Sequence, residues 1–263
     1  MNLRIGISPC PNDVFIFSGL LLKTVTPSWD PDFIFEDVQT LNGLARNNAC
    51  DLIKISYANA LNCPDYKLLN CGGALGRGCG PLLLTNSKPW NPDAEVMVPG
   101  EQTTANFLLD FWAGSNSKAP LKKRFVVFDE LYRELLTIPD AQGVVIHEMR
   151  FTYERDGLRL VQDLGEHWEK STGYPIPLGA LAYNSKPWMP TAAEIEATIR
   201  ESLDWAWAHE AEALELCGRY SQSMEPTVMR SHIDLYVNEF SRNLGTAGTA
   251  AVDFFLSLLG KRF

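Results

Sequence analysis

Apolar and polar positions follow two alternating patterns along most of the chain. Short apolar runs predict strands, and longer segments with an apolar residue every three or four positions predict helices. The predicted strands are residues 3–7, 33–36, 52–55, 66–70, 82–85, 96–98, 125–128, 143–146, 158–163 and 178–183. The predicted helices between them are residues 13–22, 38–46, 104–112, 130–137 and 165–172. Such alternation is typical of an α/β fold with largely parallel sheets.

The pattern changes after Pro190, where helical periodicity replaces the alternation. Residues 191–217, 226–237 and 245–258 are predicted to be helical. Thr191 has the chemistry of an N-cap for the first of these helices, because its hydroxyl can accept a hydrogen bond from an early helix amide. The C-terminal segment is therefore predicted to be all helix.

A short repeat indicates how the chain is divided. Asn-Ser-Lys-Pro-Trp follows a predicted strand at residues 86–90 and again at residues 184–188. A proline favours an extended turn over a continued strand or helix. Either the two turns are coincidental, or they mark two crossings of the chain between lobes. The second interpretation predicts a first lobe from residues 1–86 plus 186–263, a second lobe from residues 87–185, and a ligand cleft between them.

Composition and charge narrow the classes of partner. The 263 residues are 46% hydrophobic and 21% charged, which is ordinary for a globular protein. A net charge of -9 disfavours nucleic acid or an anionic membrane surface as the main partner. No apolar stretch approaches the roughly 20 residues that span a bilayer. Because the chain starts on a strand-like run rather than a secretory signal, we expect a cytoplasmic protein.

The cysteines point to neither a metal site nor a disulfide framework. The six cysteines, at positions 10, 50, 63, 71, 79 and 217, include no C-x-x-C pair, and no histidine lies at zinc-site spacing. We therefore expect reduced thiols, buried or half-buried, and no metal.

Two polar segments follow predicted strands of the first lobe. In SPCPND, residues 8–13, Asn12 either only caps a helix or belongs to a turn whose backbone amides bind a carboxylate. In DLIKIS, residues 51–56, Ser56 ends a strand where α/β proteins bind their ligands. Lys54, inside this apolar strand, either extends to the sheet edge or presents its ammonium group to an acidic ligand.

Two further segments offer groups for an anion. In GGALGRGCGP, residues 72–81, Arg77 is either a solvated loop residue or a bidentate clamp for a carboxylate. The segment lacks the lysine of a nucleotide-binding P-loop. In PGEQTTA, residues 99–105, either Thr103 or Thr104 caps the next helix, while the other binds an anion together with helix amides.

His147 is the candidate for chemistry, because it follows the apolar strand predicted at residues 143–146. A lone histidine is more often structural than catalytic. At the carboxyl end of a strand, however, an imidazole is well placed to act as a general base near neutral pH. The other three histidines lie in helical patterns and are interpreted as surface or packing residues. No Ser-His-Asp, Cys-His or Gly-x-Ser-x-Gly arrangement is recognisable.

Taken in order, these segments resemble a known enzyme family. SPCPND-x-FIF, DV-x-x-LN, DLIKIS, G-x-ALGRG-x-GP, PGE-x-TTA, V-x-IHE and TGYPIPLG, spread over about residues 1–188, resemble the 1,4-dihydroxy-6-naphthoate synthases of the futalosine branch of menaquinone biosynthesis. The resemblance implies a two-lobed, periplasmic-binding-protein-like type II fold. It also implies a lyase that converts cyclic dehypoxanthine futalosine to 1,4-dihydroxy-6-naphthoate.

The resemblance further implies roles for individual residues. His147 corresponds to the proposed general base, Ser56, Thr103 and Thr104 correspond to ligand-contacting positions, and Asn12 lies in the matching first loop. Because aromatisation of the product drives the reaction, no cofactor is expected. The alternatives are chorismate dehydratase, a sister enzyme of the same pathway, and a binding protein for a small carboxylate that performs no catalysis.

Overall fold

The computed structural model describes residues 1–86, 88–116, 119–221 and 225–260. The chain forms two compact units, of which unit 1 combines Met1–Gly76 with Pro177–Phe263, and unit 2 is the continuous segment Arg77–Ile176. The divisions fall before the strand that starts at Leu82 and just inside the strand that starts at Ile176. The predicted divisions, after residue 86 and before residue 186, lie at the far ends of these same two strands. Ser87 of the first Asn-Ser-Lys-Pro-Trp segment lies outside the described residues.

Unit 1 is built on a mixed sheet with strand order β2-β1-β3-β11-β4, and β5 pairs with β11 beside this path. The strands are β1 (Asn2–Ile7), β2 (Asp30–Phe35), β3 (Leu52–Ser56), β4 (Tyr66–Leu68), β5 (Ala74–Gly76) and β11 (Ile176–Asn184). Strands β2, β1 and β3 run parallel, whereas β11 is antiparallel to both β3 and β4. The expectation of largely parallel sheets therefore needs correction, because β11 brings the chain back into unit 1 in the opposite direction.

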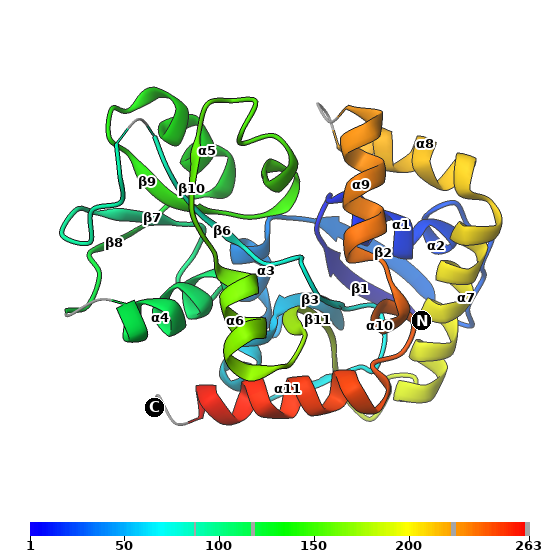
Figure 1. The fold of residues 1–263 in the computed structure, drawn as a ribbon. Helices are drawn as coiled ribbons and strands as arrows, with labels where there is room; N and C mark the ends of the chain where they lie inside the picture. The colour runs from blue at the N-terminus through cyan, green and yellow to red at the C-terminus, as the bar shows by residue number, and fades with distance from the viewer. Residues whose placement is uncertain (87, 117–118, 222–224, 261–263) are drawn as a thin grey trace. The chain divides into compact units, whose positions relative to one another are not determined.

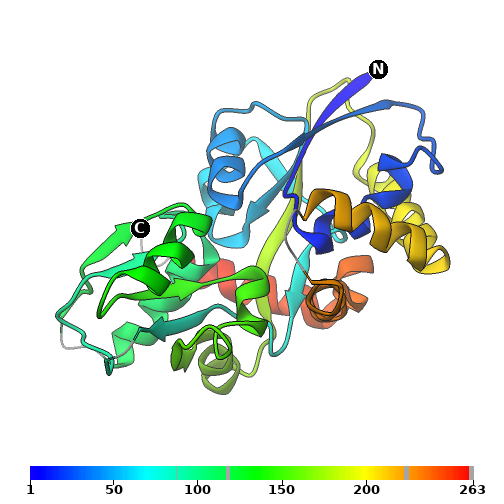
Figure 2. The same cartoon turned by 90° about the horizontal axis from the view of Figure 1, so that it is seen from above.

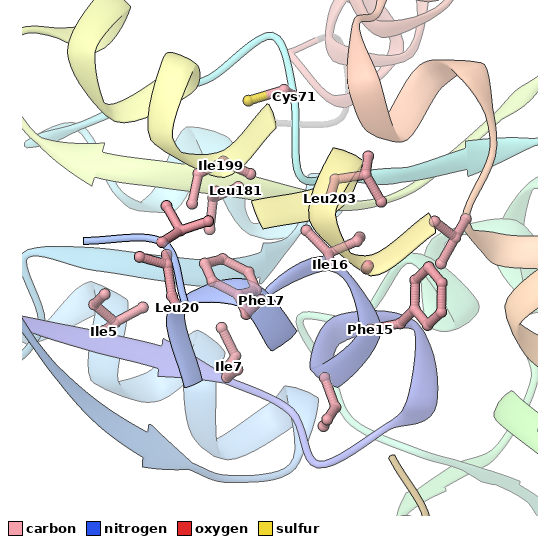
Figure 3. Packing of buried hydrophobic residues seen from close by; sticks show 14 of the residues in the cluster. Ile5, Ile7, Phe15, Ile16, Phe17, Leu20, Cys71, Leu181, Ile199 and Leu203 are labelled. Carbon is pink, nitrogen blue, oxygen red and sulfur yellow. The ribbon is translucent and has the colours of Figure 1, made fainter. Parts of the chain in front are cut away.

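The helices of unit 1 cover both faces of this sheet (Figure 1). They are α1 (Pro11–Ile16), α2 (Ser18–Leu21), α3 (Val38–Arg46), α7 (Ala192–Ala208), α8 (Glu210–Tyr220), α9 (Pro226–Tyr236), α10 (Glu239–Arg242), α11 (Gly245–Leu259) and the 3-10 helix η1 (Tyr57–Asn62). The main core lies between β1 and the helices α1, α2 and α7, and Figure 3 shows Ile5, Ile7, Phe17 and Leu203 converging there. On the opposite face, Leu41 of α3 approaches the sheet where Gly6 leaves room for it.

The helix predicted over residues 13–22 is broken at Phe17, and a side chain from α7 explains the break. In a continuous helix the Leu20 amide would bond to the Ile16 carbonyl. Ser202 occupies this position instead, since its hydroxyl donates to the Ile16 carbonyl at 2.8 Å and accepts from the Leu20 amide at 3.3 Å. The helix predicted over residues 191–217 is likewise interrupted at His209, whose backbone (φ -124°, ψ 47°) is not helical.

Unit 2 contains a five-stranded mixed sheet of order β10-β6-β9-β7-β8. The strands are β6 (Leu82–Thr85), β7 (Val96–Val98), β8 (Lys123–Phe125), β9 (Gln142–Val145) and β10 (Arg159–Asp163), and the helices are α4 (Thr104–Asn116), α5 (Phe128–Thr137), α6 (Leu164–Thr172) and the 3-10 helix η2 (His147–Phe151). Figures 1 and 2 show α5 on one face and α4 with α6 on the other. Alternate residues of the strands therefore enter two cores, of which Leu131 and Leu135 of α5 mark one.

Among the described residues, no helix combines the length and the apolar character that crossing a membrane requires. The structure contains no disulfide involving the six cysteines, five of which are buried while Cys10 is half-buried. Burial raises the pKa of the Cys71, Cys79 and Cys217 thiols to about 12, because desolvation disfavours the thiolate. These thiols are therefore neutral packing groups at physiological pH.

Candidate functional site

In unit 2, three neighbouring strand ends meet at one edge of the sheet. Strands β8, β7 and β9 are parallel, with Val98 opposite Phe125 and Met97 opposite Gly143. The chain leaves these strands toward α5, α4 and η2 respectively. The N-termini of α4 and α5 therefore lie at this edge, where their unpaired backbone amides favour negative charge.

His147 lies at this edge as the first residue of η2, two residues after the end of β9. Its φ of 58° is left-handed, a conformation that costs a non-glycine residue about 1–3 kcal/mol. Of the other described non-glycine residues with positive φ, Lys23 and Asn48 directly follow a helix C-cap, where such a conformation is common, and Asp140 lies in the turn between α5 and β9. His147 instead begins a helical turn, so the usual reason for this backbone conformation does not apply to it.

The imidazole of His147 is half-buried and packs against an aromatic ring. Its ring meets the ring of Phe128, the first residue of α5, with centroids 5.0 Å apart and planes at 80°. This edge-to-face contact is a favoured aromatic geometry and restricts the orientation of the imidazole. The predicted role of His147 as a base stays a prediction, but its place at the end of a central strand is the one the sequence indicated.

Thr103 caps α4, and Thr104 is the first residue of the helix. The Thr103 hydroxyl donates to the Gly100 carbonyl at 2.7 Å and accepts from the Asn106 amide at 3.2 Å. Both threonines are buried, at 3% exposure. Of the two roles predicted for this pair, capping therefore belongs to Thr103. Anion binding by Thr104 stays a prediction.

The glycine-rich segment passes close to α6 and forms part of a strand. A Cβ on Gly80 would lie 2.3 Å from the Cα of Gly165, so both residues must lack a side chain for the two backbones to pass. Arg77 donates to the Gly173 carbonyl at 2.8 Å and lies 3.6 Å from the Glu169 carboxylate. Its side chain is 57% exposed, so Arg77 is a surface residue attached to the end of α6, and a role as substrate clamp would require it to leave these partners.

The parallel strands β1, β2 and β3 create a corresponding edge in unit 1. They lead into α1, α3 and η1 respectively. Asp13, near the start of α1, is 2% exposed and collects several hydrogen bonds. It accepts from the Ser8 amide at 3.2 Å, from the Ser8 hydroxyl at 2.7 Å and from the Asn12 side chain at 2.9 Å. Asn12 is thus buried and bound to its neighbour, and its predicted contact with substrate stays untested.

Lys54 completes this network. Its ammonium group forms an ion pair with Asp13 and donates to the Gly72 carbonyl at 2.8 Å. The residue is 5% exposed, so it does not extend to the edge of the sheet as one of the two sequence interpretations held. Nor does its charge lack a counter-ion, because the Asp13 carboxylate provides one. Substrate binding by Lys54 stays a prediction that would require a change in this pairing.

Ser56 ends β3 and is held by Asn42 of α3. The Ser56 amide donates to the Asn42 side-chain oxygen at 2.9 Å, and the Asn42 amide group donates to the Ser56 hydroxyl oxygen at 3.0 Å. Because the hydroxyl accepts this bond, its own hydrogen points away from Asn42. Gly179 of β11 lies opposite Ser56 in the sheet.

Sequence reasoning did not assign functions to Asp13 and Asn42. Both lie inside segments that carried the family resemblance, yet each reads as an ordinary polar residue of a helix. The available signal was Lys54 within an apolar strand, since a buried lysine requires a counter-charge, but Asp13 lies 41 positions away and the sequence does not single it out among the acidic residues. The described residues contain no group of three or more His, Cys, Asp or Glu side chains that could hold a metal ion.

Comparison with known proteins identifies the family. A profile described as "Menaquinone biosynthesis" matches residues 3–261. The chain is similar to a 1,4-dihydroxy-6-naphtoate synthase of Streptomyces coelicolor, with 39% identity over 95% of this chain and 90% of the relative. It is also similar to the enzyme of that name from Thermus thermophilus, with 38% identity over 95% of this chain and 91% of the relative.

Solved structures agree on the fold. Protein AF1704 of Archaeoglobus fulgidus matches with a TM-score of 0.91 and 27% identity, covering 99% of this chain and 97% of that one. The alkanesulfonate-binding protein SsuA of Xanthomonas axonopodis pv. citri matches with a TM-score of 0.70 and 14% identity, covering 97% of this chain and 92% of that one. The expected periplasmic-binding-protein-like α/β fold is thereby confirmed, and the chain belongs to the menaquinone biosynthesis family, alongside the 1,4-dihydroxy-6-naphthoate synthases.

Proposed function

We propose that this protein is a 1,4-dihydroxy-6-naphthoate synthase that uses His147 as its general base. Its substrate is cyclic dehypoxanthine futalosine, and the reaction releases a three-carbon fragment. One observation carries the assignment of the base: within a family of biosynthetic enzymes, His147 has a strained backbone at the end of the central strand β9, beside the N-termini of α4 and α5. Strain of this kind is concentrated at functional sites.

The proposed chemistry needs a base, a group that stabilises an enolate oxygen and a cradle for a carboxylate. His147 removes the acidic proton next to the ring carbonyl. Thr104 and the first backbone amides of α4 stabilise the developing oxyanion, because the helix N-terminus presents unpaired N–H groups and a positive dipole end. The reaction ends in an aromatic product, which supplies the driving force without a redox cofactor or a metal.

Unit 1 contributes the second set of groups in this proposal. The Ser56 hydroxyl donates its hydrogen to the substrate, while Asn42 holds the oxygen of this hydroxyl in place. Ser56 ends β3, and the carboxyl ends of parallel strands are where α/β proteins bind ligands. We expect this reaction to take place in the cytoplasm.

The test is to incubate the purified protein with cyclic dehypoxanthine futalosine and to detect the naphthoate product by mass spectrometry. We expect turnover by the wild type and a loss of about 100-fold to 10,000-fold in kcat for His147→Ala, the range typical of removing a general base. Substrate binding by this variant should stay within about tenfold, or roughly 1.4 kcal/mol. His209→Ala is the matched control, because His209 is exposed and stacks only on Trp205 of its own unit.

Different failures lead to different conclusions. Full turnover by His147→Ala would remove this residue from its role and leave the reaction itself intact. Turnover of chorismate in place of the futalosine derivative would identify a dehydratase. If the wild type bound a small acid tightly and converted neither compound, the protein would be a ligand-binding protein.

A further inference from the structure

Arg150 lies in the same short helix as His147 and binds two other segments of unit 2. Its guanidinium group donates to the Gly80 carbonyl at 2.6 Å and to the Asp163 carboxylate at 2.5 Å. The side chains of Arg150 and Asp163 are only 18% and 15% exposed. A charge-assisted pair with so little exposure is stronger and less screened than a surface ion pair.

Both partners of Arg150 are fixed in position. Asp163 caps α6, since its second carboxylate oxygen accepts from the Gly165 amide at 2.9 Å and from the Glu166 amide at 3.0 Å. Gly80 is held because its backbone passes against Gly165 with no room for a side chain. Arg150 therefore attaches η2 to a rigid junction between the start of β6 and the start of α6.

His147 is three residues before Arg150 in a 3-10 helix. Because the φ of His147 is left-handed, the direction of its imidazole does not follow regular 3-10 geometry and depends on how the turn after it is held. The left-handed backbone of His147 persists only if the surrounding structure holds it there. The Phe128 ring restrains the imidazole, and Arg150 restrains the helical turn that carries it.

We propose that Arg150 is a positioning residue that holds His147 in its left-handed backbone conformation and thereby aims its imidazole. Arg150 touches no reacting atom in this proposal and acts through His147. The catalytic consequence rests on the proposed role of His147 as base, whereas the structural consequence can be measured without any turnover.

The experiment compares Arg150→Met, which removes both hydrogen bonds and keeps the stem, with Arg150→Lys. Misplacing a catalytic group by about 1 Å can cost about 100-fold in rate. We expect kcat of Arg150→Met to fall by about 10-fold to 100-fold with KM within about threefold of the wild type. Arg150→Lys should lose less, because an ammonium group can keep one of the two contacts but lacks the bidentate fork. Arg155→Met, which removes an exposed arginine from the next turn, is the control and should keep wild-type kinetics.

A double variant and a spectrum distinguish positioning from a general structural effect. If Arg150 acts only through His147, adding Arg150→Met to His147→Ala should slow the residual rate no further. The Cα and Cβ chemical shifts of His147, which report its φ, should move in Arg150→Met and stay unchanged in Arg155→Met. Additive losses, unchanged shifts, or wild-type kcat in Arg150→Met would each overturn the proposal.

A second variant tests the same contact if Arg150→Met does not fold. Asp163→Asn then replaces it, because the amide oxygen can still cap α6 while the charged partner of Arg150 is lost. The same loss of kcat and the same shift of the His147 signals are then expected, and their absence would refute the proposal. If His147→Ala keeps full activity but Arg150→Met still moves the His147 signals, the positioning stands and only the role of the base fails.

Discussion

The buried ion pair between Lys54 and Asp13 allows a quantitative test of what holds the candidate site of unit 1 together. Both side chains are at most 6% exposed. Replacing Lys54 by methionine keeps most of its apolar stem but leaves the Asp13 carboxylate without a counter-charge. Breaking a buried pair in this way typically costs about 3–5 kcal/mol. For a unit of this size, that corresponds to a fall of roughly 6–20 °C in melting temperature.

The assay is urea denaturation followed by tryptophan fluorescence, combined with hydrogen exchange read separately from peptides of each unit. We expect exchange protection to fall in β1, α1 and β3, because Asp13 and Lys54 join these segments. Arg219→Met is the matched control in the same unit, since Arg219 pairs with Glu215 in an exposed i,i+4 arrangement with side chains 63% and 68% exposed. Such a pair contributes about 0.3–0.5 kcal/mol.

A second substitution tests whether the unpaired charge is the cause. The double variant Asp13→Asn/Lys54→Met has no buried charge at this position, and the asparagine oxygen can still accept from Ser8. It should therefore be more stable than Lys54→Met alone, although it lacks the ion pair. If Lys54→Met costs no more than Arg219→Met, or if the double variant is the least stable of all, the buried pair does not have the energetic role assigned to it.

Two further predictions concern packing and pH. Gly80→Ala should destabilise unit 2 by about 1–3 kcal/mol, because its Cβ would lie 2.5 Å or less from the Gly165 backbone. Gly114→Ala is the control, since Gly114 has open space around it in α4, and it should stabilise the protein by up to about 1 kcal/mol. Equal melting temperatures for the two variants would contradict this prediction. Stability should fall as the pH rises above 9.0, because the unfolded chain ionises its thiols there while burial raises the native pKa of Cys71 and Cys79 to about 12. Melting temperatures measured from pH 7 to 11 should show a smaller alkaline loss for Cys71→Ala than for the wild type, and an identical loss would rule out this source.

Elements with a local cause could be predicted from the sequence. The helix predicted over residues 38–46 matches α3, because Asp37 caps it by accepting from the Gln39 and Thr40 amides and its apolar residues have helical spacing. The predicted strands at residues 82–85 and 96–98 likewise match β6 and β7. In each case the residues that decide the structure lie within a few positions of one another.

Features that depend on distant residues could not be predicted in this way. The break at Phe17 depends on Ser202, which lies 182 positions after the Leu20 amide it accepts from. Strand β5 runs through a glycine-rich segment and forms because β11 pairs with it. For the candidate site, the sequence indicated the strand ends and His147. The sequence did not indicate that Asp13 pairs with Lys54 or that Arg150 donates to Gly80 and Asp163, because these contacts form only once the chain is folded.

The discontinuous construction of unit 1 has a consequence for synthesis on the ribosome. Its first part ends at Gly76, and β11, which lies between β3 and β4 in the sheet, begins only at Ile176. When β1, β2 and β3 have emerged, they therefore have no strand to connect them to β4. Unit 2 is continuous, and its last helix is complete at Thr172. Because domains fold as units during translation, unit 2 should reach its native state before unit 1 does. Until β11 has been synthesised, the edge of β3 that pairs with β11 in the folded sheet stays exposed.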